Sequence, residues 1–463
     1  MGKKIVVAGA GHGGLIAAYY LAAAGYDVTV YEKKAEGTLG YDQYDSVHLD
    51  GFELAGIPVP EEYRVKRTPL SFILPGLELS PITQGVSEDS YNVEIDRRAL
   101  CTILLGLAKE AGARIEYNTK VRGPVMLGSR VAGVETDRGV VYADLVIDAA
   151  GLYSPVRSQL PDYLLIDKEA GEGNVLSAYR GYFDRIEGID APELRYQVYL
   201  LPGSDCGLMW VITHEDHADV LIGKFRPLEE SEIEQGLKTL RELNPHLGNN
   251  LLRGGKVMKI PVRQPMGMLV ADGYAAVGDS AFMTIPIKGS GIGYSMRAGK
   301  LLADCVQADK NGCYTRDTLW KYQCDFFDNI GFDAGTLAII KSALPKVSRE
   351  DIEYLIRENI LSPELLQKFG NEEGMAKIIS SMGFGGLRDM TKKIVGHQNL
   401  RKLILSSGKA VAKYAMVRQG LKAKYEPKTA EKWTRSYNKF YDSLNSGAED
   451  ADEKPEEKQD EEA

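Results

Sequence analysis

The chain has few cysteines and no closely spaced pair of them. Its 463 residues include five cysteines, at positions 101, 206, 305, 313 and 324, and no two form a C-x-x-C pair. Scattered thiols in odd number offer no pairing for a disulfide framework and no ligand set for zinc or an iron–sulfur cluster. We therefore expect no metal site and a reducing environment such as the cytoplasm.

Long hydrophobic runs are absent too. No stretch reaches the ~18 consecutive apolar residues that a membrane span needs. β-prone residues begin within the first few positions, which leaves no room for a secretion signal before them. We expect a cytoplasmic protein that touches a membrane at most from its surface.

An excess of positive charge is missing as well. The net charge is −9, and residues 449–463 alone hold nine acids and two lysines, which leaves only −2 for the rest of the chain. This stretch has too little apolar surface to offset the entropy lost on ordering. We predict a disordered acidic tail over residues 446–463 and no nucleic-acid partner.

The N-terminal segment "KKIVVAGAGHGGLIAAYYLAAAGYDVTVYEKK", residues 3–34, predicts a strand, a glycine turn, a helix and a second strand. Glycines in the turn permit a tight bend and the close approach of a pyrophosphate, which the positive N-terminus of the helix attracts. An acid that closes the second strand can accept hydrogen bonds from both hydroxyls of a ribose. The pattern does not separate NAD from FAD. It predicts a dinucleotide site made of Gly9, Gly11, Gly13, Gly14 and Glu32.

The chain then departs from regular βα repetition. Residues 33–95 are rich in proline, glycine and short β-prone runs, and the next clear helix is "RRALCTILLGLAKEAG", residues 97–112. A small meander and a return strand should follow, and the return strand enters "DAAGLYSPVR", residues 148–157. Later, "AAVGDSAFMTIPIKGSGIG", residues 275–293, places an acid, a lysine and glycines behind an apolar strand. It is not a second phosphate loop, because the lysine precedes the last glycines instead of following them.

These segments, together with "DRRAL" at 96–100 and "TKV" at 119–121, occur in an order that resembles one FAD-dependent superfamily. It includes the geranylgeranyl reductases and the para-hydroxybenzoate hydroxylase-like monooxygenases, and the resemblance covers residues 1–310. It implies FAD as the cofactor and a single site shared by the two glycine-rich segments. In that family the residue matching Arg97 contacts the cofactor, the one matching Val121 meets the adenine end through its backbone, and the one matching Asp279 bonds a ribityl hydroxyl. Backbone N–H groups at the start of the last helix would face the pyrimidine edge of the flavin. The implied cofactor residues are Arg97, Val121, Gly278, Asp279, Gly291 and Ile292.

The same resemblance implies the domain organisation. The fold would be α/β, with a Rossmann-like FAD-binding domain of the glutathione reductase type, an inserted β-sheet substrate domain and a C-terminal helical extension. The expected FAD-binding segments are 1–60, 90–160 and 255–310. The substrate-binding sheet would take 61–89 and 161–254, and the helical region 311–445.

Two motifs bear on the chemistry. The hydroxylases of the superfamily carry Asp-Gly where this chain has Ala150-Gly151, and this difference argues against direct use of NAD(P)H and hydroxylation. Geranylgeranyl reductases carry a pocket pattern Tyr-x-Trp-x-Phe-Pro, of which "GLMWVIT", residues 207–213, keeps the tryptophan. Trp210 is therefore a candidate for the substrate pocket, although a large aromatic in a strand is often only a core residue.

We predict an FAD-dependent CH–CH oxidoreductase that reduces C=C bonds of a lipophilic, isoprenoid-like substrate with electrons from a ferredoxin-like donor or NAD(P)H. Two alternatives stay open: a monooxygenase that uses NAD(P)H and O₂, and a flavoprotein that passes electrons to quinone. No catalytic residue is identified, because lone histidines such as His12 and His48 are more often structural. Tyr41, Asp42 and Tyr44 lie where the related reductases have a cysteine beside the flavin.

The C-terminal third is helical in pattern and strongly basic in one part. Residues 391–428 hold ten Lys or Arg and one acid, Glu426, and "NLRKLILSSGKAVAKYAMVRQGLKAKY" interleaves apolar and basic positions. Such a helix can meet an anionic membrane surface, and the alternative is a solvated helix face.

Overall fold

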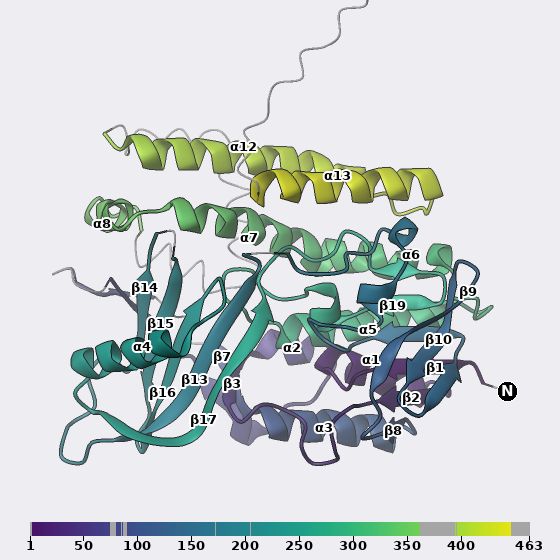
Figure 1. Cartoon of the computed structure of the whole chain (residues 1–463), viewed down its shortest axis with the longest axis horizontal. Helices are drawn as coiled ribbons and strands as arrows, with labels where there is room; N and C mark the ends of the chain where they lie inside the picture. The colour runs from purple at the N-terminus through teal and green to yellow at the C-terminus, as the bar shows by residue number, and fades with distance from the viewer. Residues whose placement is uncertain are drawn as a thin grey trace, which may run out of the picture.

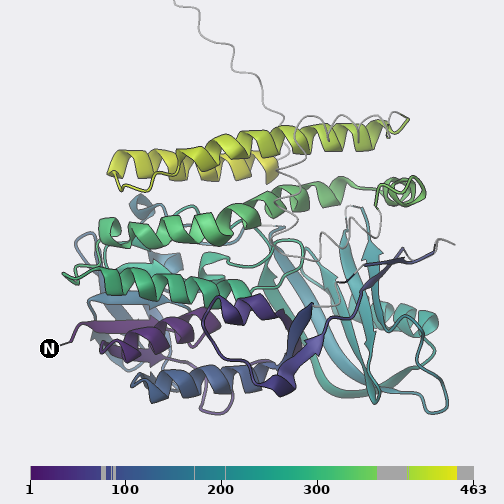
Figure 2. The ribbon, with the colours of Figure 1, turned by 180° about the vertical axis from the view of Figure 1, so that it is seen from behind.

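The computed structural model describes residues 2–74, 80–84, 86, 90–171, 173–203, 205–361, 394 and 396–445. Two large sheets lie side by side, and C-terminal helices cover them in layers (Figures 1 and 2). The tail expected over 446–463 lies outside the described residues, as does part of the basic region.

A six-stranded sheet carries the first βαβ unit. Its strand order is β18-β19-β12-β1-β2-β8, and all neighbours are parallel except β18 and β19. The strands are almost wholly buried, because α1 packs against β1 and β2 and a strand of the following meander packs against β1 and β12. The bounds are β1 (Lys4–Ala8), β2 (Asp27–Tyr31), β8 (Arg114–Glu116), β12 (Leu145–Asp148), β18 (Val270–Ala271) and β19 (Tyr274–Ala276), with helices α1 (His12–Ala23), α3 (Arg97–Glu110) and α5 (Ile292–Ala308).

The expected meander is present as an antiparallel three-stranded sheet. It consists of β9 (Val121–Leu127), β10 (Arg130–Thr136) and β11 (Gly139–Tyr142), and β12 then returns to the centre of the parallel sheet beside β1. A second small sheet, β3 (Tyr44–His48), β7 (Tyr91–Asp96) and β4 (Arg64–Lys66), forms within the irregular stretch after β2. The short helix α2 (Leu49–Glu53) follows β3 directly.

A seven-stranded sheet forms the other half of the molecule. Its order is β17-β13-β16-β15-β14-β5-β6, and helix α4 (Glu230–Leu243) packs on its outer face. β17 runs to Pro261 and therefore crosses the expected boundary at residue 255, because it pairs with β13 along nearly its whole length. The strands are β5 (Ser71–Ile73), β6 (Ile82–Thr83), β13 (Val175–Arg185), β14 (Tyr196–Leu201), β15 (Gly207–Thr213), β16 (His217–Lys224) and β17 (Leu247–Pro261).

The C-terminal helices form two layers over both sheets. The outer pair, α12 (Gln398–Gly420) and α13 (Pro427–Asn445), stacks on α7 (Phe332–Ala343) (Figures 1 and 2). Aromatic side chains fill the space between the layers: the ring of Phe327 lies 5.1 Å from Trp433 and 5.4 Å from Tyr437, centroid to centroid. The remaining elements are α6 (Arg316–Phe326), the π-helix η5 (Phe327–Gly331), α8 (Arg349–Arg357) and the short 3-10 helices η1 (Glu61–Tyr63), η2 (Arg157–Gln159), η3 (Asp162–Leu164), η4 (Gly278–Ala281) and η6 (Leu344–Lys346).

No helix in the described ranges is long and apolar enough to cross a membrane.

Candidate functional site

The first glycine turn lies at the carboxyl end of β1 and leads into α1. Gly9 has φ +89°, a backbone conformation that favours glycine, and Gly11 is the N-cap of the helix. A Cβ on Gly13 would come within 2.6 Å of the Ser295 carbonyl oxygen on α5, so this glycine is required by helix packing. Within the described residues no side chain caps α1, which leaves its first N–H groups available to an anionic ligand.

Glu32 ties the turn to the end of the second strand. Its Oε2 accepts a hydrogen bond of 2.9 Å from the N–H of Ala10, and its Oε1 accepts one of 2.9 Å from Lys34. Its carbonyl oxygen accepts from Thr119, two residues before Val121 begins β9. Glu32 and Val121 therefore lie at the same edge of the sheet, next to the glycine turn. Their contacts with a ribose and an adenine stay predictions.

The second glycine-rich segment reaches the same sheet edge. The N–H of Val277 donates to the carbonyl of Asp148, so the chain leaving β19 runs beside the end of β12. Gly278 has φ +68° and begins η4, and α5 then starts at Ile292 with Gly291 as N-cap. A Cβ on Gly291 would lie 2.8 Å from Cγ2 of Thr284. The described residues supply no side-chain cap for α5 either. Two uncapped helix N-termini, α1 and α5, thus belong to one site.

Arg97, Asp279 and His12 come together between these two segments. Burial raises the pKa of Asp279, while Arg97 and Arg157 lower it. The pKa of His12 is lowered to about 3 by burial and by the charge of Arg97, which together outweigh the opposite effect of Asp45. The Nε2 atom of His12 is buried and has no hydrogen-bond partner among the described residues. An unpartnered polar atom at the start of an uncapped helix fits a site whose ligand supplies polar groups.

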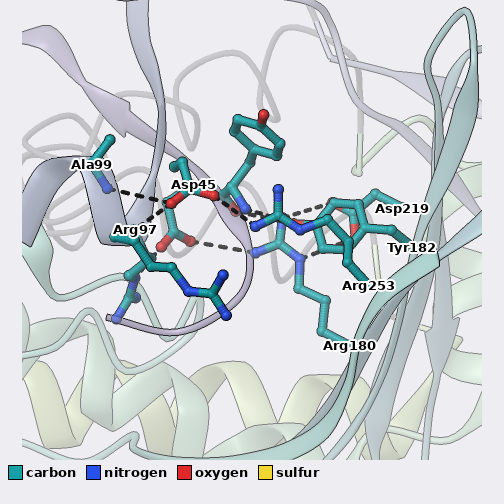
Figure 3. A network of polar contacts seen from close by, with 10 residues as sticks. Asp45, Arg97, Ala99, Arg180, Tyr182, Asp219 and Arg253 are labelled. Carbon is teal, nitrogen blue, oxygen red and sulfur yellow. Dashed lines mark hydrogen bonds and ion pairs between the residues drawn. The ribbon is translucent and has the colours of Figure 1, made fainter. Parts of the chain in front are cut away.

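A network of charged residues joins this site to the seven-stranded sheet (Figure 3). Asp45 on β3 forms an ion pair with Arg97 and accepts from Nη1 of Arg180 on β13 at 3.4 Å. Arg180 also binds both carboxylate oxygens of Asp219 on β16, at 3.0 and 2.6 Å. One partly buried carboxylate, that of Asp45, therefore connects the cofactor side of the molecule with the sheet.

The candidate pocket residue Trp210 belongs to the same network. Its Nε1 donates to Asp219 at 3.5 Å, and the Arg180 guanidinium lies 5.3 Å from the centroid of its ring. Trp210 is half-buried on the inner face of the sheet, where it packs against an apolar cluster. We call this cluster the inner apolar band: Leu176, Ala178, Leu208, Trp210, Leu221, Phe225, Ile260 and Val262.

The inner apolar band meets the second glycine-rich segment. A Cβ on Gly289 would lie 3.5 Å from Leu176 and 3.6 Å from Ile260, which is ordinary van der Waals distance. The loop just before α5 therefore touches the apolar face that also carries Trp210.

The segment after β2 is held by a second set of contacts. Arg253 on β17 forms ion pairs with Asp42 at 2.9 Å and Asp96 at 2.6 Å. The backbone N–H of Tyr44 donates to the hydroxyl of Tyr182 at 2.8 Å, and the Arg253 guanidinium lies 4.8 Å from the Tyr44 ring. Sequence reasoning missed Arg180, Asp219 and Arg253. They lie on three strands far apart in the chain, and no local spacing groups them.

Two other candidates have partners of their own. His48 contacts Arg67 at 3.2 Å through Nε2 and Asp50 at 3.6 Å through Nδ1. Asp148, two residues before Ala150, accepts from Ser154 at 2.5 Å and from Tyr274 at 3.0 Å and is fully buried. Asp148 is thus part of the interior and does not replace the aspartate of the hydroxylases.

Comparison with known proteins identifies the family. The profile described as FAD dependent oxidoreductase matches residues 56–305, more than half of the chain, and an NAD(P)-binding Rossmann-like profile matches residues 7–54. The chain belongs to the FAD-dependent oxidoreductase family. Its cofactor is FAD, and the uncapped helices α1 and α5, the close-packed glycines and the unpartnered His12 atom fit that group.

Relatives of this FAD-dependent oxidoreductase include two archaeal reductases. The chain is 24% identical over 377 residues to the digeranylgeranylglycerophospholipid reductase of Sulfolobus acidocaldarius, with 78% of this chain and 81% of the relative covered. It is 29% identical over 373 residues to digeranylgeranylglycerophospholipid reductase 1 of Methanopyrus kandleri, with 76% and 93% covered.

Solved structures show the same fold. A geranylgeranyl bacteriochlorophyll reductase-like protein from Thermoplasma acidophilum superposes with a TM-score of 0.65 at 21% identity, covering 82% of this chain and 98% of that one. PqsL of P. aeruginosa in complex with 2-aminobenzoylacetate gives a TM-score of 0.58 at 20% identity, covering 77% and 100%. The Rossmann-like FAD-binding fold and the C-terminal helices expected from the sequence are confirmed.

Proposed function

We propose that this oxidoreductase reduces C=C bonds in the isoprenoid chains of a lipid. The observation that carries the proposal is the inner apolar band, which lies against the loop before α5. Its partly exposed members are the side chains that a lipophilic chain next to the cofactor site would contact: Leu208, Trp210, Phe225 and Ile260. The names of the archaeal relatives point to a geranylgeranyl lipid as the substrate class. Bound FAD, once reduced, supplies the hydride.

In this proposal the chain's own residues bind, orient and exclude water. The N-termini of α1 and α5 hold the cofactor, with Arg97, Asp279 and Glu32 beside it. The inner apolar band receives the isoprenoid chain and keeps water away from it. Trp210 would form part of the wall, held in its rotamer by Asp219 and by the Arg180 guanidinium.

A lipid substrate also calls for access to a membrane surface, and we propose helix α12 for that contact. Five exposed residues share one face of this helix: Arg401, Lys402, Leu405, Lys409 and Met416. Leu405 is 42% and Met416 73% exposed, so apolar groups stand between the cations. This pattern is typical of a helix that lies on an anionic lipid surface.

The test begins with the FAD-loaded protein, photoreduced without oxygen and mixed in turn with a geranylgeranyl phospholipid, a quinone and oxygen. We expect the lipid to reoxidise the flavin and to gain two hydrogen atoms for each double bond lost, as seen by mass spectrometry. Reoxidation by quinone or oxygen alone, with the lipid unchanged, would overturn the proposal. Hydroxylated lipid formed with NAD(P)H and oxygen would instead show a monooxygenase. Supplying NAD(P)H or a reduced ferredoxin in place of light identifies the electron donor.

A further inference from the structure

Lys341 is a buried cation for which the described part of the chain supplies no carboxylate partner. It lies on α7, is 7% exposed, and its Nζ donates to the carbonyl of Gly173 at 2.5 Å and to Oδ1 of Asn174 at 3.2 Å. Both acceptors are neutral. Two buried arginines differ in this respect, since Arg180 binds Asp219 and Arg263 binds Asp167, each at 2.6 Å.

The electrostatics agree with this geometry. The pKa of Lys341 is lowered to about 8, chiefly by burial; Cys206 raises it and Arg263 lowers it. Burial raises the pKa of the Cys206 thiol, so this neighbour is neutral at pH 7 and supplies no counter-charge. A buried ammonium is costly unless an anion compensates it. Lys341 is still mostly protonated at pH 7, and an anionic ligand beside it would offset the cost of burying its charge.

The position of Lys341 relates it to the inner apolar band. Its Nζ lies 5.4 Å from the ring centroid of Phe225, a member of the band. Its partner Asn174 directly precedes β13. Leu176 and Ala178 of this strand belong to the band, and Arg180 lies just beyond them. Arg180 is the sixth residue after Asn174, which is a distance of about 20 Å at the usual rise per strand residue. The band thus runs from the network of Figure 3 to Lys341, long enough for several isoprene units.

We propose that Lys341 binds the phosphate group of the substrate lipid while the isoprenoid chain lies along the inner apolar band. This inference rests on the proposed function and adds the recognition of the charged end. Two of the three N–H groups of Lys341 hold Gly173 and Asn174, and the third is directed to the phosphate. The ligand chemistry is a phosphate oxygen, and we assign its source to the lipid headgroup and not to free phosphate.

The test compares two substrates on three variants of the FAD-loaded enzyme. The substrates are a geranylgeranyl phospholipid and the uncharged alcohol geranylgeraniol, and the variants are Lys341→Gln, Lys341→Arg and the control Lys346→Gln, whose lysine is exposed. We expect Lys341→Gln to raise KM about 10- to 100-fold for the phospholipid, the loss of one charge-assisted hydrogen bond. Its KM for geranylgeraniol should stay unchanged, Lys341→Arg should recover part of the phospholipid affinity, and Lys346→Gln should behave as wild type. FAD content per chain checks that each variant is folded.

Four outcomes overturn the inference. Equal KM values for the phospholipid in wild type and Lys341→Gln would show that Lys341 does not contact the phosphate. An equal fall of kcat on both substrates, with KM unchanged, would show that Lys341 supplies a proton or supports the fold. Inorganic phosphate that stabilises the wild type but not Lys341→Gln, while the KM for the lipid is the same in both, would assign the site to free phosphate. If Lys341→Gln raises KM equally for both substrates, the substitution affects binding of the isoprenoid chain and not of the headgroup. If the wild type reduces neither substrate, the proposed function itself fails, and that result is distinct from all four.

Discussion

At the scale of single residues, the glycines of the first turn serve packing as much as ligand binding. Gly13 lies where α1 crosses α5, and a Cβ there would also come within 2.6 Å of Cγ2 of Val277. A Cβ on Gly299 of α5 would in turn lie 2.3 Å from the carbonyl oxygen of Gly13. The two helices whose N-termini form the cofactor site are therefore held at glycine-to-glycine distance.

We expect Gly13→Ala to destabilise the protein by about 1–3 kcal/mol, because backbone atoms on both sides must shift. It should also reduce the FAD bound per chain, since the shift displaces the start of α1. Thermal unfolding and the flavin absorbance of the purified protein measure both effects. The control is Gly106→Ala in α3, where a Cβ meets nothing within 4 Å. That change should stabilise by about 0.5–1 kcal/mol. A normal FAD content in Gly13→Ala would contradict the packing argument.

Of the residues in the network of Figure 3, Arg180 is the one whose replacement should lower the free energy of unfolding most. Its side chain is 10% exposed and that of Asp219 is 3% exposed, so Arg180→Met leaves a buried carboxylate without a cation. We expect a loss of about 3–5 kcal/mol in the free energy of unfolding, measured by urea denaturation. Arg226→Met breaks ion pairs of a side chain that is 42% exposed and should lower the free energy of unfolding much less, because solvent screens these pairs. Similar losses in both variants would show that burial does not govern the network.

The pH dependence of stability gives a separate test of Lys341. Its folded pKa of about 8 lies below the unfolded value of 10.5, so the unfolded chain binds more protons between these two values. The cost of burying the charge is therefore complete below pH 8 and disappears as the pH rises toward 10.5, by at most about 1.4 kcal/mol per pH unit. Lys341→Met should be more stable than wild type at pH 7, and this difference should shrink from pH 8 to pH 10.5. A difference that does not change with pH would contradict the lowered pKa.

At the scale of elements, the helices expected from the sequence pattern match the structure except where packed aromatic rings interrupt a helix. The stretch from Leu319 to Leu344 has a helical pattern throughout, yet the structure divides it into α6, the π-helix η5 and α7. A Cβ on Gly331 would lie 2.8 Å from the ring of Phe327. The irregular turn thus coincides with the rings that pack under α13, and a helical period alone carries no information about such a contact.

The exposed apolar side chains of helix α12 should contribute to its binding of an anionic membrane surface. Leu405→Asp and Met416→Asp should each weaken binding to anionic vesicles several-fold, because they remove apolar burial and add repulsion. Vesicle flotation with anionic and with neutral lipids measures the effect. Leu127→Asp on β9, a position that is 60% exposed, serves as the control and should bind as wild type. No preference of the wild type for anionic vesicles would remove the proposed contact.

At the scale of the whole molecule, the cofactor site lies where the two halves of the chain meet. The six-stranded sheet supplies the ends of β1, β2, β12 and β19, and the seven-stranded sheet contributes through Arg180, Arg253 and the inner apolar band. Bound FAD should therefore stabilise the entire fold.

Removing FAD should lower the free energy of unfolding by about 2.7 kcal/mol relative to a sample at one hundred times the dissociation constant. Differential scanning calorimetry of the apo and FAD-loaded protein, with FAD at several concentrations, measures the change in Tm. A Tm that does not depend on FAD concentration would contradict a site formed by both halves.

The sequence by itself determined the first βαβ unit, the meander, the helical C-terminal third and the family to which they belong. These features depend on local spacing: glycines in a turn, alternation in strands and a 3.6-residue period in helices. The convergence of the two glycine-rich segments followed from resemblance alone, and the pairing of β1 and β19 with β12 places them at one edge. Only the tertiary structure brought Asp45, Arg180 and Asp219 together and buried Lys341 with neutral acceptors among the described residues. Charges on separate strands meet through register and sheet packing, and these relations leave no local pattern in the sequence.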